Sequence, residues 1–399
     1  MIPGQRHTVT GSSATGIPTL MRVGFNAYLL SHSSLRGWNR YTVNLLAALP
    51  AHGVQPVLYA TAPIHPDHLS RLPPETFEVR IAPPMRYLSF ENRWLPRQLR
   101  ADRIDVFHCP MNYGLPWSTP CPRVLTLHDA IDQIYYQRRA GLWQRWRPSA
   151  LRTRLTNWAA RRRAHRVITV SEHAKRDLAG YLAIPAERIT VVYEAADPVF
   201  HRPVSPDAVR DVREKWKLAR PYFFYVGGWE GRKNVPFLVR AFARLARTDV
   251  DLVLAGGHDR ERAALQQLAT QSGCAERVRL LGFVPDADLP AFYAGALAFV
   301  YPSEYEGFGL QVCEAMAVGC PVLVARATSL PEIAGNGGET FALDDPGELA
   351  GLLRRVADDD AFRADLSRRA KVRASDFSWD RAAAETVRVY QQLQRGVRT

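Results

Sequence analysis

Short apolar runs alternate with longer amphipathic stretches along almost the whole chain. The runs in the first half read RVGFN, VLYA, FEVRI, DVFH, VLTLH, RVITV and ITVVY, and those in the second half read YFFYVG, DLVLAG, RVRLLG, LAFVY and PVLVA. Amphipathic stretches such as RYTVNLLAALPAHG and NVPFLVRAFARLA lie between them. Near-continuous apolar strands that alternate with helices are typical of parallel sheets covered on both faces. The pattern therefore predicts an α/β fold.

The alternation breaks once, at the proline-rich segment HRPVSPD that follows ITVVYEAADPVF. We place a domain boundary there, between a Rossmann-like domain over residues 21–203 and a second over residues 204–378, each doubly wound and of ordinary domain size. Residues 379–396 are predicted to form a helix that packs back onto the first domain. Residues 1–20 are rich in Gly, Ser, Thr and Pro and lack the apolar core of a signal peptide. We expect them to be a disordered extension, either native or introduced by cloning or an early start codon.

Composition narrows the class of protein further. The chain has 399 residues, 47% of them hydrophobic, and contains no apolar run of the roughly 18–20 residues that a membrane-spanning helix needs. Its cysteines are odd in number and never form a Cys-x-x-Cys pair, which argues against a disulfide framework and a zinc knuckle. We expect a reducing, cytoplasmic setting. The cysteines are Cys109, Cys121, Cys274, Cys313 and Cys320.

The net charge of +13 is concentrated in one stretch, over residues 137–166, which has no acidic residue and contains three tryptophans. Such a stretch suits contact with an anionic membrane surface, an acidic ligand or nucleic acid, or forms a solvated helical face. We favour peripheral contact with the inner face of the cytoplasmic membrane and expect no nucleic-acid partner. The arginines are Arg138, Arg139, Arg145, Arg147, Arg152, Arg154, Arg161, Arg162, Arg163 and Arg166.

The segment YPSEYEGFGLQVCEAMAVGCPVLV, residues 301–324, places two glutamates among apolar residues. The strand LAFVY ends at Tyr301, and a helix is predicted to begin near Leu310, so Glu306 lies in the loop between them and Glu314 in the first or second helical turn. Ligands of open α/β sheets bind at the carboxyl ends of the strands. Helical side chains point toward the helix N-terminus. Both carboxylates are therefore predicted to face one crevice.

The same loop offers backbone groups to an anion. Gly307 and Gly309 permit close approach of a ligand, and the first helical turn has free N–H groups. A sugar nucleotide fits this arrangement, with Glu314 accepting hydrogen bonds from ribose hydroxyls, Glu306 and the following amides holding the sugar, and the diphosphate near the helix N-terminus. The alternative is that Glu306 caps the helix and Glu314 is a core glutamate whose hydrogen bonds are made within the fold.

The Glu-x7-Glu spacing of Glu306 and Glu314, with its surroundings, resembles the retaining glycosyltransferases of family 4. The resemblance extends over nearly the whole chain after Met21, is strongest over residues 222–343, and within the family is greatest to bacterial mannosyl- and related transferases of surface polysaccharides. It implies the GT-B fold, in which two Rossmann-like domains face a central cleft. It also implies metal-independent, retaining transfer from a GDP- or UDP-sugar to a glycan, lipid-linked or other hydroxyl acceptor, with no cofactor beyond the substrate.

The segment YVGGWEGRKN brings two cations to the end of a predicted strand. A nucleotide diphosphate that leaves gains negative charge, which a fixed cation stabilises. Lys233 matches the family's lysine. The usual arginine follows the first glycine, Gly227, where this chain has Gly228, so Arg232 is expected to substitute, as in relatives that carry RKN. The alternative is two exposed basic residues on a loop.

The resemblance assigns further donor-binding positions. Backbone groups around Phe283 and Val284 are implied to contact the base, so the sequence does not separate uridine from guanosine. Gly256, in the pair that ends DLVLAGG, is explained either by close approach to phosphates or by a tight turn. The remaining donor-binding candidates are Gly227, Gly228, Gly307, Phe308, Gly309 and Leu310.

In the first half, VLTLHDAID ends a strand with His128 and Asp129. The family has a His-Asp pair here, and the resemblance implies that the histidine contacts the donor sugar and the acceptor hydroxyl. The alternative is a buried histidine whose hydrogen bonds are all made within the fold. Metal binding is disfavoured because no second histidine cluster accompanies the pair. Gly37 and Asn39 are acceptor-side candidates, because GWNRY stands where relatives have GIGRY. Weaker candidates at strand ends are Asn26, His108 and Ser171.

One further departure lies at the predicted domain junction. The family often shows Asn-Gly-Val-Asp there, whereas this chain has Glu194 and Ala195 in the first two places and keeps Asp197.

Competing functions are a GT-B enzyme with other chemistry, such as an epimerase or a phosphorylase, a basic membrane-surface or nucleic-acid-binding protein, and a non-catalytic sugar-nucleotide binder. Glycosidase action is disfavoured, because no acid/base pair stands out beyond the two assigned glutamates.

Overall fold

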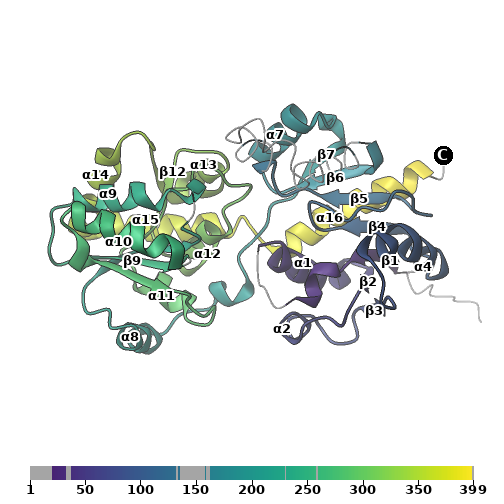
Figure 1. Cartoon of the computed structure of the whole chain (residues 1–399), viewed down its shortest axis with the longest axis horizontal. Helices are drawn as coiled ribbons and strands as arrows, with labels where there is room; N and C mark the ends of the chain where they lie inside the picture. The colour runs from purple at the N-terminus through teal and green to yellow at the C-terminus, as the bar shows by residue number, and fades with distance from the viewer. Residues whose placement is uncertain are drawn as a thin grey trace, which may run out of the picture.

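The computed structural model describes residues 20–32, 37–131, 134, 158, 162–229, 231–257 and 259–397. Within these residues the chain forms two lobes, each built around its own parallel sheet (Figure 1). The predicted class, two doubly wound parallel α/β units, is confirmed. The expected extension over residues 1–20, apart from Leu20, and most of the arginine-rich stretch lie outside the described residues.

The first lobe contains a sheet of seven parallel strands in the order β3-β2-β1-β4-β5-β6-β7. The strand order reverses between β1 and β4, which is where such sheets bind ligands. Every run that the sequence pattern identified in this half becomes a strand. Their bounds are β1 (Met21–Asn26), β2 (Val54–Ala60), β3 (Glu78–Ile81), β4 (Val106–Cys109), β5 (Arg123–Thr126), β6 (Arg166–Thr169) and β7 (Ile189–Val191).

The second lobe contains a sheet of six parallel strands in the order β10-β9-β8-β11-β12-β13, which reverses between β8 and β11. The sequence pattern predicted five of these strands. It missed β13, because its short edge sequence GETF is half polar and only two of its four residues are buried. The bounds are β8 (Tyr222–Gly227), β9 (Asp251–Gly256), β10 (Val278–Gly282), β11 (Ala298–Tyr301), β12 (Val322–Ala325) and β13 (Gly338–Phe341).

Several helices start at a polar side chain that accepts a hydrogen bond from the first turn, the usual N-cap arrangement. Ser171, Ser205, Asp345 and Asp359 do so for α7, α8, α14 and α15. The helices used below are α1 (Gly37–Ala48), α2 (Pro66–Leu69), α7 (Glu172–Leu182), α8 (Pro206–Lys215), α9 (Val235–Ala243), α10 (Asp259–Gln271), α11 (Leu289–Gly295), α12 (Leu310–Val318), α13 (Leu330–Ala334), α14 (Pro346–Asp358), α15 (Asp360–Ala374) and α16 (Trp379–Val397).

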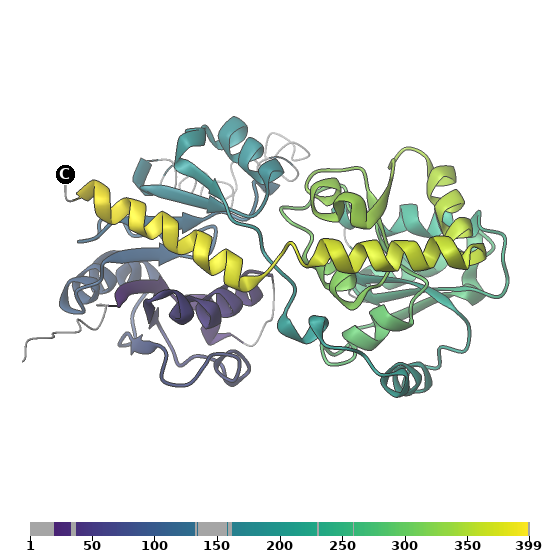
Figure 2. The same cartoon turned by 180° about the vertical axis from the view of Figure 1, so that it is seen from behind.

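The chain crosses between the lobes twice, once after β7 and once between α15 and α16 (Figure 2). The 3-10 helix η7 (Pro198–His201) already contacts α12, and the rings of Phe200 and Tyr293 lie 5.9 Å apart. The last helix, α16, returns to the first lobe and contacts α1 and β4. The indole of Trp379 donates to the carbonyl of Ala196 over 3.1 Å, and the hydroxyl of Tyr390 lies 2.6 Å from Nδ1 of His108.

Candidate active site between the lobes

Lys233 and Glu306 come together where the strand order of the second sheet reverses. Lys233 ends the 3-10 helix η8 (Gly231–Lys233), which follows β8, and Glu306 lies in the loop between the neighbouring strand β11 and α12. Because parallel neighbours end at the same edge of a sheet, their side chains meet there. Nζ of Lys233 donates to Oε1 of Glu306 over 2.7 Å, and both side chains are buried.

One oxygen of Glu306 accepts three hydrogen bonds. Besides Lys233, Nη1 of Arg232 donates to Oε1 over 2.9 Å and Oγ of Ser303 donates over 2.6 Å. Burial by itself raises the pKa of Glu306, but Lys233, Arg232 and these hydrogen bonds outweigh it and lower the pKa below its usual value. Glu306 is therefore ionised at neutral pH. Lys233 also donates to the hydroxyl of Tyr301 over 2.6 Å.

The loop that carries Glu306 is fixed by side chains from both lobes. In the second lobe, Oγ of Ser329 donates to the carbonyls of Glu306 and Phe308 over 3.0 and 2.8 Å. From the first lobe, Oγ of Ser171 donates to the carbonyl of Gly307 over 2.6 Å. A Cβ at Gly307 would stand 2.3 Å from the carbonyl oxygen of His128, so only glycine permits this approach. The loop therefore lies directly against the first lobe.

Glu314, on the second turn of α12, bonds to a residue of the other lobe. Nη1 of Arg40, on α1, donates to Oε1 of Glu314 over 2.5 Å, and the hydroxyl of Tyr293 donates to Oε2 over 3.2 Å. The second amino nitrogen of Arg40 lies 2.7 Å from Oδ2 of Asp286. Burial raises the pKa of Glu314 to about 7, against the attraction of Arg40 and with added repulsion from Asp197 and Asp286. This carboxylate thus gains and loses its proton near neutral pH.

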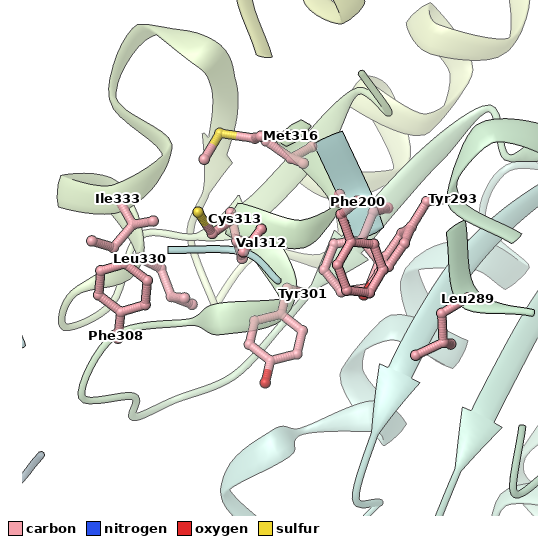
Figure 3. Close-up of a cluster of buried hydrophobic side chains, with 14 of the residues drawn as sticks. Phe200, Leu289, Tyr293, Tyr301, Phe308, Val312, Cys313, Met316, Leu330 and Ile333 are labelled. Atoms are coloured by element: carbon pink, nitrogen blue, oxygen red, sulfur yellow. The ribbon is translucent and has the colours of Figure 1, made fainter. Parts of the chain in front are cut away.

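The burial of Glu314 comes from the apolar packing around α12. Figure 3 shows side chains from η7, α11, β11, α12 and α13 gathered around this helix. Glu314 retains 1% exposure, and its helical neighbours are also buried. A carboxylate in such surroundings is costly to ionise unless a cation or hydrogen-bond donors accompany it. The apolar side chains in Figure 3 include Phe200, Leu289, Tyr293, Tyr301, Phe308, Val312, Cys313, Met316, Leu330 and Ile333.

His128 lies on the first-lobe side of the same loop, just after β5. Its ring is buried, with Nδ1 3.0 Å from Oε1 of Glu194 and Nε2 3.2 Å from the carbonyl oxygen of Pro110. Its backbone N–H donates to Oδ1 of Asn112 over 3.0 Å. Oδ1 of the next residue, Asp129, accepts from the N–H of Ile131 over 3.1 Å, which closes the turn after the strand.

Further polar contacts join the lobes away from the glutamates. The carboxylate of Glu332, on α13, accepts hydrogen bonds from the N–H groups of Glu172 and His173 over 2.7 and 3.0 Å, so a residue of the second lobe caps helix α7 of the first. The hydroxyl of Tyr305 donates to Asp177 over 2.5 Å. The contacts of Glu332 give residues 329–333 a structural role.

Comparisons with known proteins agree with this architecture. Residues 35–200 match the model of Glycosyltransferase Family 4, and residues 210–373 match that of Glycosyl transferases group 1. An uncharacterised glycosyltransferase of Methanocaldococcus jannaschii is 33% identical over 305 residues, which cover 73% of this chain and 76% of that protein. The chain belongs to glycosyltransferase family 4. Its resemblance to that family is thus confirmed.

Two further relatives are proteins of Escherichia coli. O-antigen chain mannosyltransferase B of Escherichia coli is 36% identical over 231 residues, 57% of this chain and 60% of that protein. The matched regions span less than two thirds of that relative and about a third, 33%, of the E. coli serotype-specific mannosyltransferase WbdA. Among solved structures, Anabaena HepE in complex with UDP has a TM-score of 0.73 at 19% identity, covering 94% of this chain and 100% of that one. WaaG, a glycosyltransferase involved in lipopolysaccharide biosynthesis, has a TM-score of 0.71 at 18% identity, covering 92% and 99%.

The structure of this family 4 member brings together many of the predicted site residues. Side chains or backbone of both lobes meet at the loop after β11 and at α12. Gly309 has a φ of 105°, which favours glycine, and Leu310 begins α12. The predicted residues gathered there are His128, Asp129, Arg232, Lys233, Glu306, Gly307, Phe308, Gly309, Leu310 and Glu314.

Other predicted donor-side positions have partners within the second lobe. A Cβ at Gly256 would stand 2.3 Å from the carbonyl oxygen of Gly227, so the approach of β8 to β9 already explains this glycine. Gly228 follows β8, and its carbonyl accepts a hydrogen bond from Tyr225 over 2.5 Å. Val284 is buried, whereas the side chain of Phe283, just after β10, is 81% exposed. These residues remain predicted ligand contacts.

In the first lobe, Gly37 begins α1 at an exposed position, and the buried amide of Asn39 lies 3.5 Å from His68 of α2. The weaker candidates are also accounted for by structure. Asn26 donates to the carbonyl of Gly114 over 2.9 Å, and Ser171 caps α7. Burial lowers the pKa of His108 to about 3, so this ring is a neutral core histidine.

The sequence reasoning missed several residues of the site. Arg40, Tyr301, Ser303, Asp286 and Glu332 all contact predicted site residues or join the lobes. A signal existed for Arg40, which is the arginine of the GWNRY segment and follows the same loop as Gly37. No local pattern marks the others, because their partners come from distant parts of the chain.

We expect the affinity for an intact nucleotide sugar to follow the charge of Glu314. Since the pKa of Glu314 is raised to about 7, lowering the pH through that value protonates the carboxyl. If Glu314 contacts ribose as the sequence predicts, this removes acceptors for the ribose hydroxyls. Binding of GDP-mannose or UDP-glucose, measured by calorimetry, should weaken by about tenfold from pH 8 to pH 6. A nucleotide sugar is the right probe, because the terminal phosphate of a free diphosphate itself titrates near pH 6. The Glu314→Gln variant should bind weakly with little pH dependence; an unchanged slope would contradict the assignment.

We expect Gly307→Ala to impair turnover far more than folding. The added methyl group would meet the backbone oxygen of His128 at 2.3 Å and Cβ of Asp129 at 3.0 Å, which forces the loop and the first lobe apart. A displacement of about 1 Å near reacting groups costs up to about a hundredfold in rate. Turnover and X-ray scattering would report the effect. Gly351→Ala on α14 is the matched control, because nothing lies within 4 Å of its added Cβ; equal losses in both variants would refute the prediction.

Proposed function

We propose that the protein is a retaining, metal-independent glycosyltransferase that transfers a hexose from a nucleotide sugar to a hydroxyl of a glycan or lipid-linked acceptor. The observation that carries the proposal is the cluster of Lys233, Arg232 and Glu306 at the point where the strand order reverses, beside Glu314 on the following helix. Family 4 membership supports it. The names of the E. coli mannosyltransferases favour mannose as the sugar.

The donor is assigned to the second lobe. Its diphosphate lies near Lys233 and Arg232, its sugar near Glu306, and its ribose near Glu314. The indole Nε1 of Trp229, in the loop between β8 and η8, is buried and has no hydrogen-bond partner among the described residues, so it can donate to a bound ligand. UDP in the structure of HepE supports a nucleotide diphosphate as ligand. Because Glu314 is almost completely buried against Arg40 and Tyr293, ribose reaches it only when at least one of these side chains moves.

The transfer requires charge stabilisation more than proton transfer by a side chain. The acceptor oxygen forms a bond to the anomeric carbon while the bond from that carbon to the β-phosphate oxygen breaks. The proton of the acceptor hydroxyl passes to an oxygen of the departing diphosphate on the same face of the sugar. Lys233 and Arg232 offset the negative charge that grows on the diphosphate, an effect typically worth about 10²–10³ in rate for one donor. Glu306 holds both cations in place and orients the sugar.

The acceptor is assigned to the first lobe, near His128, Asp129, Gly37 and Asn39. None of the helices in the described part of the chain has the length and apolarity needed to cross a bilayer. Arg163 lies 4.5 Å from the ring of Trp117 and 5.0 Å from that of Trp158, both largely exposed. Such a cation–aromatic surface suits an anionic membrane. We therefore assign the enzyme to the cytoplasmic face of the membrane, with a lipid-linked acceptor preferred and no nucleic-acid partner.

A panel of nucleotides identifies the donor. We expect either GDP or UDP, and the corresponding sugar nucleotide, to raise the melting temperature of the full chain, while ADP and its sugars do not. Ligand at about 100 times its dissociation constant stabilises a protein by about 2.7 kcal/mol. GDP-mannose is expected to give the largest shift. Stabilisation by none of these ligands would refute the proposal, and binding without either hydrolysis or transfer would indicate a non-catalytic binder.

The variant Lys233→Ala tests the phosphate-binding role. We expect transfer to fall by about 10²–10³ in kcat, because the charge of the departing diphosphate loses its closest cation. The melting temperature should change little by comparison, since removal of Lys233 leaves Arg232 and Ser303 on Glu306. Lys215→Ala, an exposed lysine of α8, is the control and should retain activity. Near wild-type turnover in Lys233→Ala would exclude this role.

A further inference from the structure

Glu194 brings a carboxylate next to a buried histidine of the first lobe. It lies just after β7, at the crossing between the lobes, and is buried. Its Oε1 lies 3.0 Å from Nδ1 of His128. This carboxylate therefore lies against the histidine that the proposed function assigns to the acceptor side.

Both ring nitrogens of His128 face an oxygen atom. Nδ1 faces a carboxylate oxygen of Glu194, and Nε2 faces the carbonyl oxygen of Pro110 at 3.2 Å. A neutral imidazole has one N–H donor and one acceptor nitrogen, so it would set a lone pair against one of these oxygens. An imidazolium donates to both. An un-ionised Glu194 that donates to Nδ1 would fit the same geometry, but a carboxylic acid is a stronger acid than an imidazolium, so the proton belongs on the ring.

We propose that Glu194 is a positioning residue that holds His128 as an imidazolium. In this state Nδ1–H donates to Glu194. Nε2–H donates to the Pro110 carbonyl and can donate to a substrate oxygen in its place. His128 then serves as a hydrogen-bond donor and a fixed positive charge, and it does not take the proton of the acceptor hydroxyl. The inference rests on the proposed function only for the place of His128 beside the substrate.

The other titratable groups near the ring are neutral or are hydrogen-bonded in the turn. The ring of Tyr41, on α1, lies 4.7 Å from that of His128, and burial raises the pKa of its hydroxyl well above 10. The pKa of His108, on β4, is lowered by burial, then by the charge of His128. Burial raises the pKa of Cys313, on α12, to about 12, with Glu194 among the groups that raise it further. Asp129, the next residue in the chain, accepts from Ile131.

Variants of Glu194 separate the effect of its charge from that of its hydrogen bond. A side-chain amide accepts a hydrogen bond from Nδ1–H but adds no charge, so it stabilises the imidazolium less than a carboxylate does. Glu194→Gln removes only the charge, and Glu194→Asn removes the charge and shortens the side chain. Glu194→Asp keeps the charge on a shorter side chain. Together these variants separate charge from shape.

The direct test is a pH titration of the histidine rings by ¹H–¹⁵N NMR on the full chain, labelled at histidine and assigned with His128→Asn. In the wild type we expect both ring nitrogens of His128 to be protonated at pH 7. In Glu194→Gln and Glu194→Asn the ring should lose its proton at a lower pH, and Glu194→Asp should restore the wild-type behaviour. Glu187→Gln, an exposed glutamate close to β7, is the control and should match the wild type.

A neutral His128 ring in the wild type at pH 7, or an identical titration in Glu194→Gln, would overturn the inference. Should Glu194→Gln fail to fold, the wild-type titration and Glu194→Asp still decide it. Turnover gives a second readout: the Glu194→Gln enzyme should lose about tenfold in kcat at pH 8 and little at pH 6, whereas a structural defect would lower both. The NMR result requires no substrate, so a protein that binds no nucleotide sugar would refute the proposed function and leave this inference standing.

Discussion

The ion pair between Arg40 and Glu314 joins the two lobes at the centre of the site. Glu314 retains 1% exposure, and a buried carboxylate without a cation or hydrogen-bond donors is costly. Its cation comes from α1 of the opposite lobe, over 2.5 Å, and the same arginine also contacts Asp286. The arrangement of the lobes and the charge of the site are therefore coupled: whatever moves α1 away from α12 also changes the proton affinity of Glu314.

Glu306 differs from Glu314 in that its cations belong to its own lobe. Lys233 and Arg232 follow the neighbouring strand, so Glu306 stays ionised whatever the position of the first lobe. Two glutamates eight residues apart thus have pKa values shifted in opposite directions, one lowered and one raised to about 7. Divergent environments of this kind commonly assign different roles to paired acids. Here Glu306 is a permanent anion, whereas the charge of Glu314 depends on the position of the opposite lobe.

The sequence predicted the fold and the proximity of Lys233 and Glu306, because both depend on local order along the chain. Apolar runs marked twelve of the thirteen strands in the described residues, and placing Glu306 and Lys233 directly after strands brought them to one sheet edge. It did not predict β13, whose sequence is half polar, or Arg40 as the partner of Glu314, because that contact joins residues 274 positions apart. The departure at Glu194 was visible in the sequence, but its contact with His128 depends on how β5 and β7 lie in the sheet.

The contacts between the lobes are of two kinds: aromatic packing where the chain crosses, and polar contacts elsewhere in the interface. An aromatic group of Tyr193, Phe308 and Phe377 lies where the chain crosses, with ring centroids 5.7 to 6.5 Å apart. The contacts of Arg40, Ser171, Tyr305 and Glu332 across the interface are hydrogen bonds and ion pairs. When the lobes separate, water can replace such polar contacts at a modest cost in free energy. Separating apolar side chains exposes them to water and loses the free energy of their burial. A rotation about the aromatic group would therefore open the site for substrate exchange and leave each sheet and its core intact.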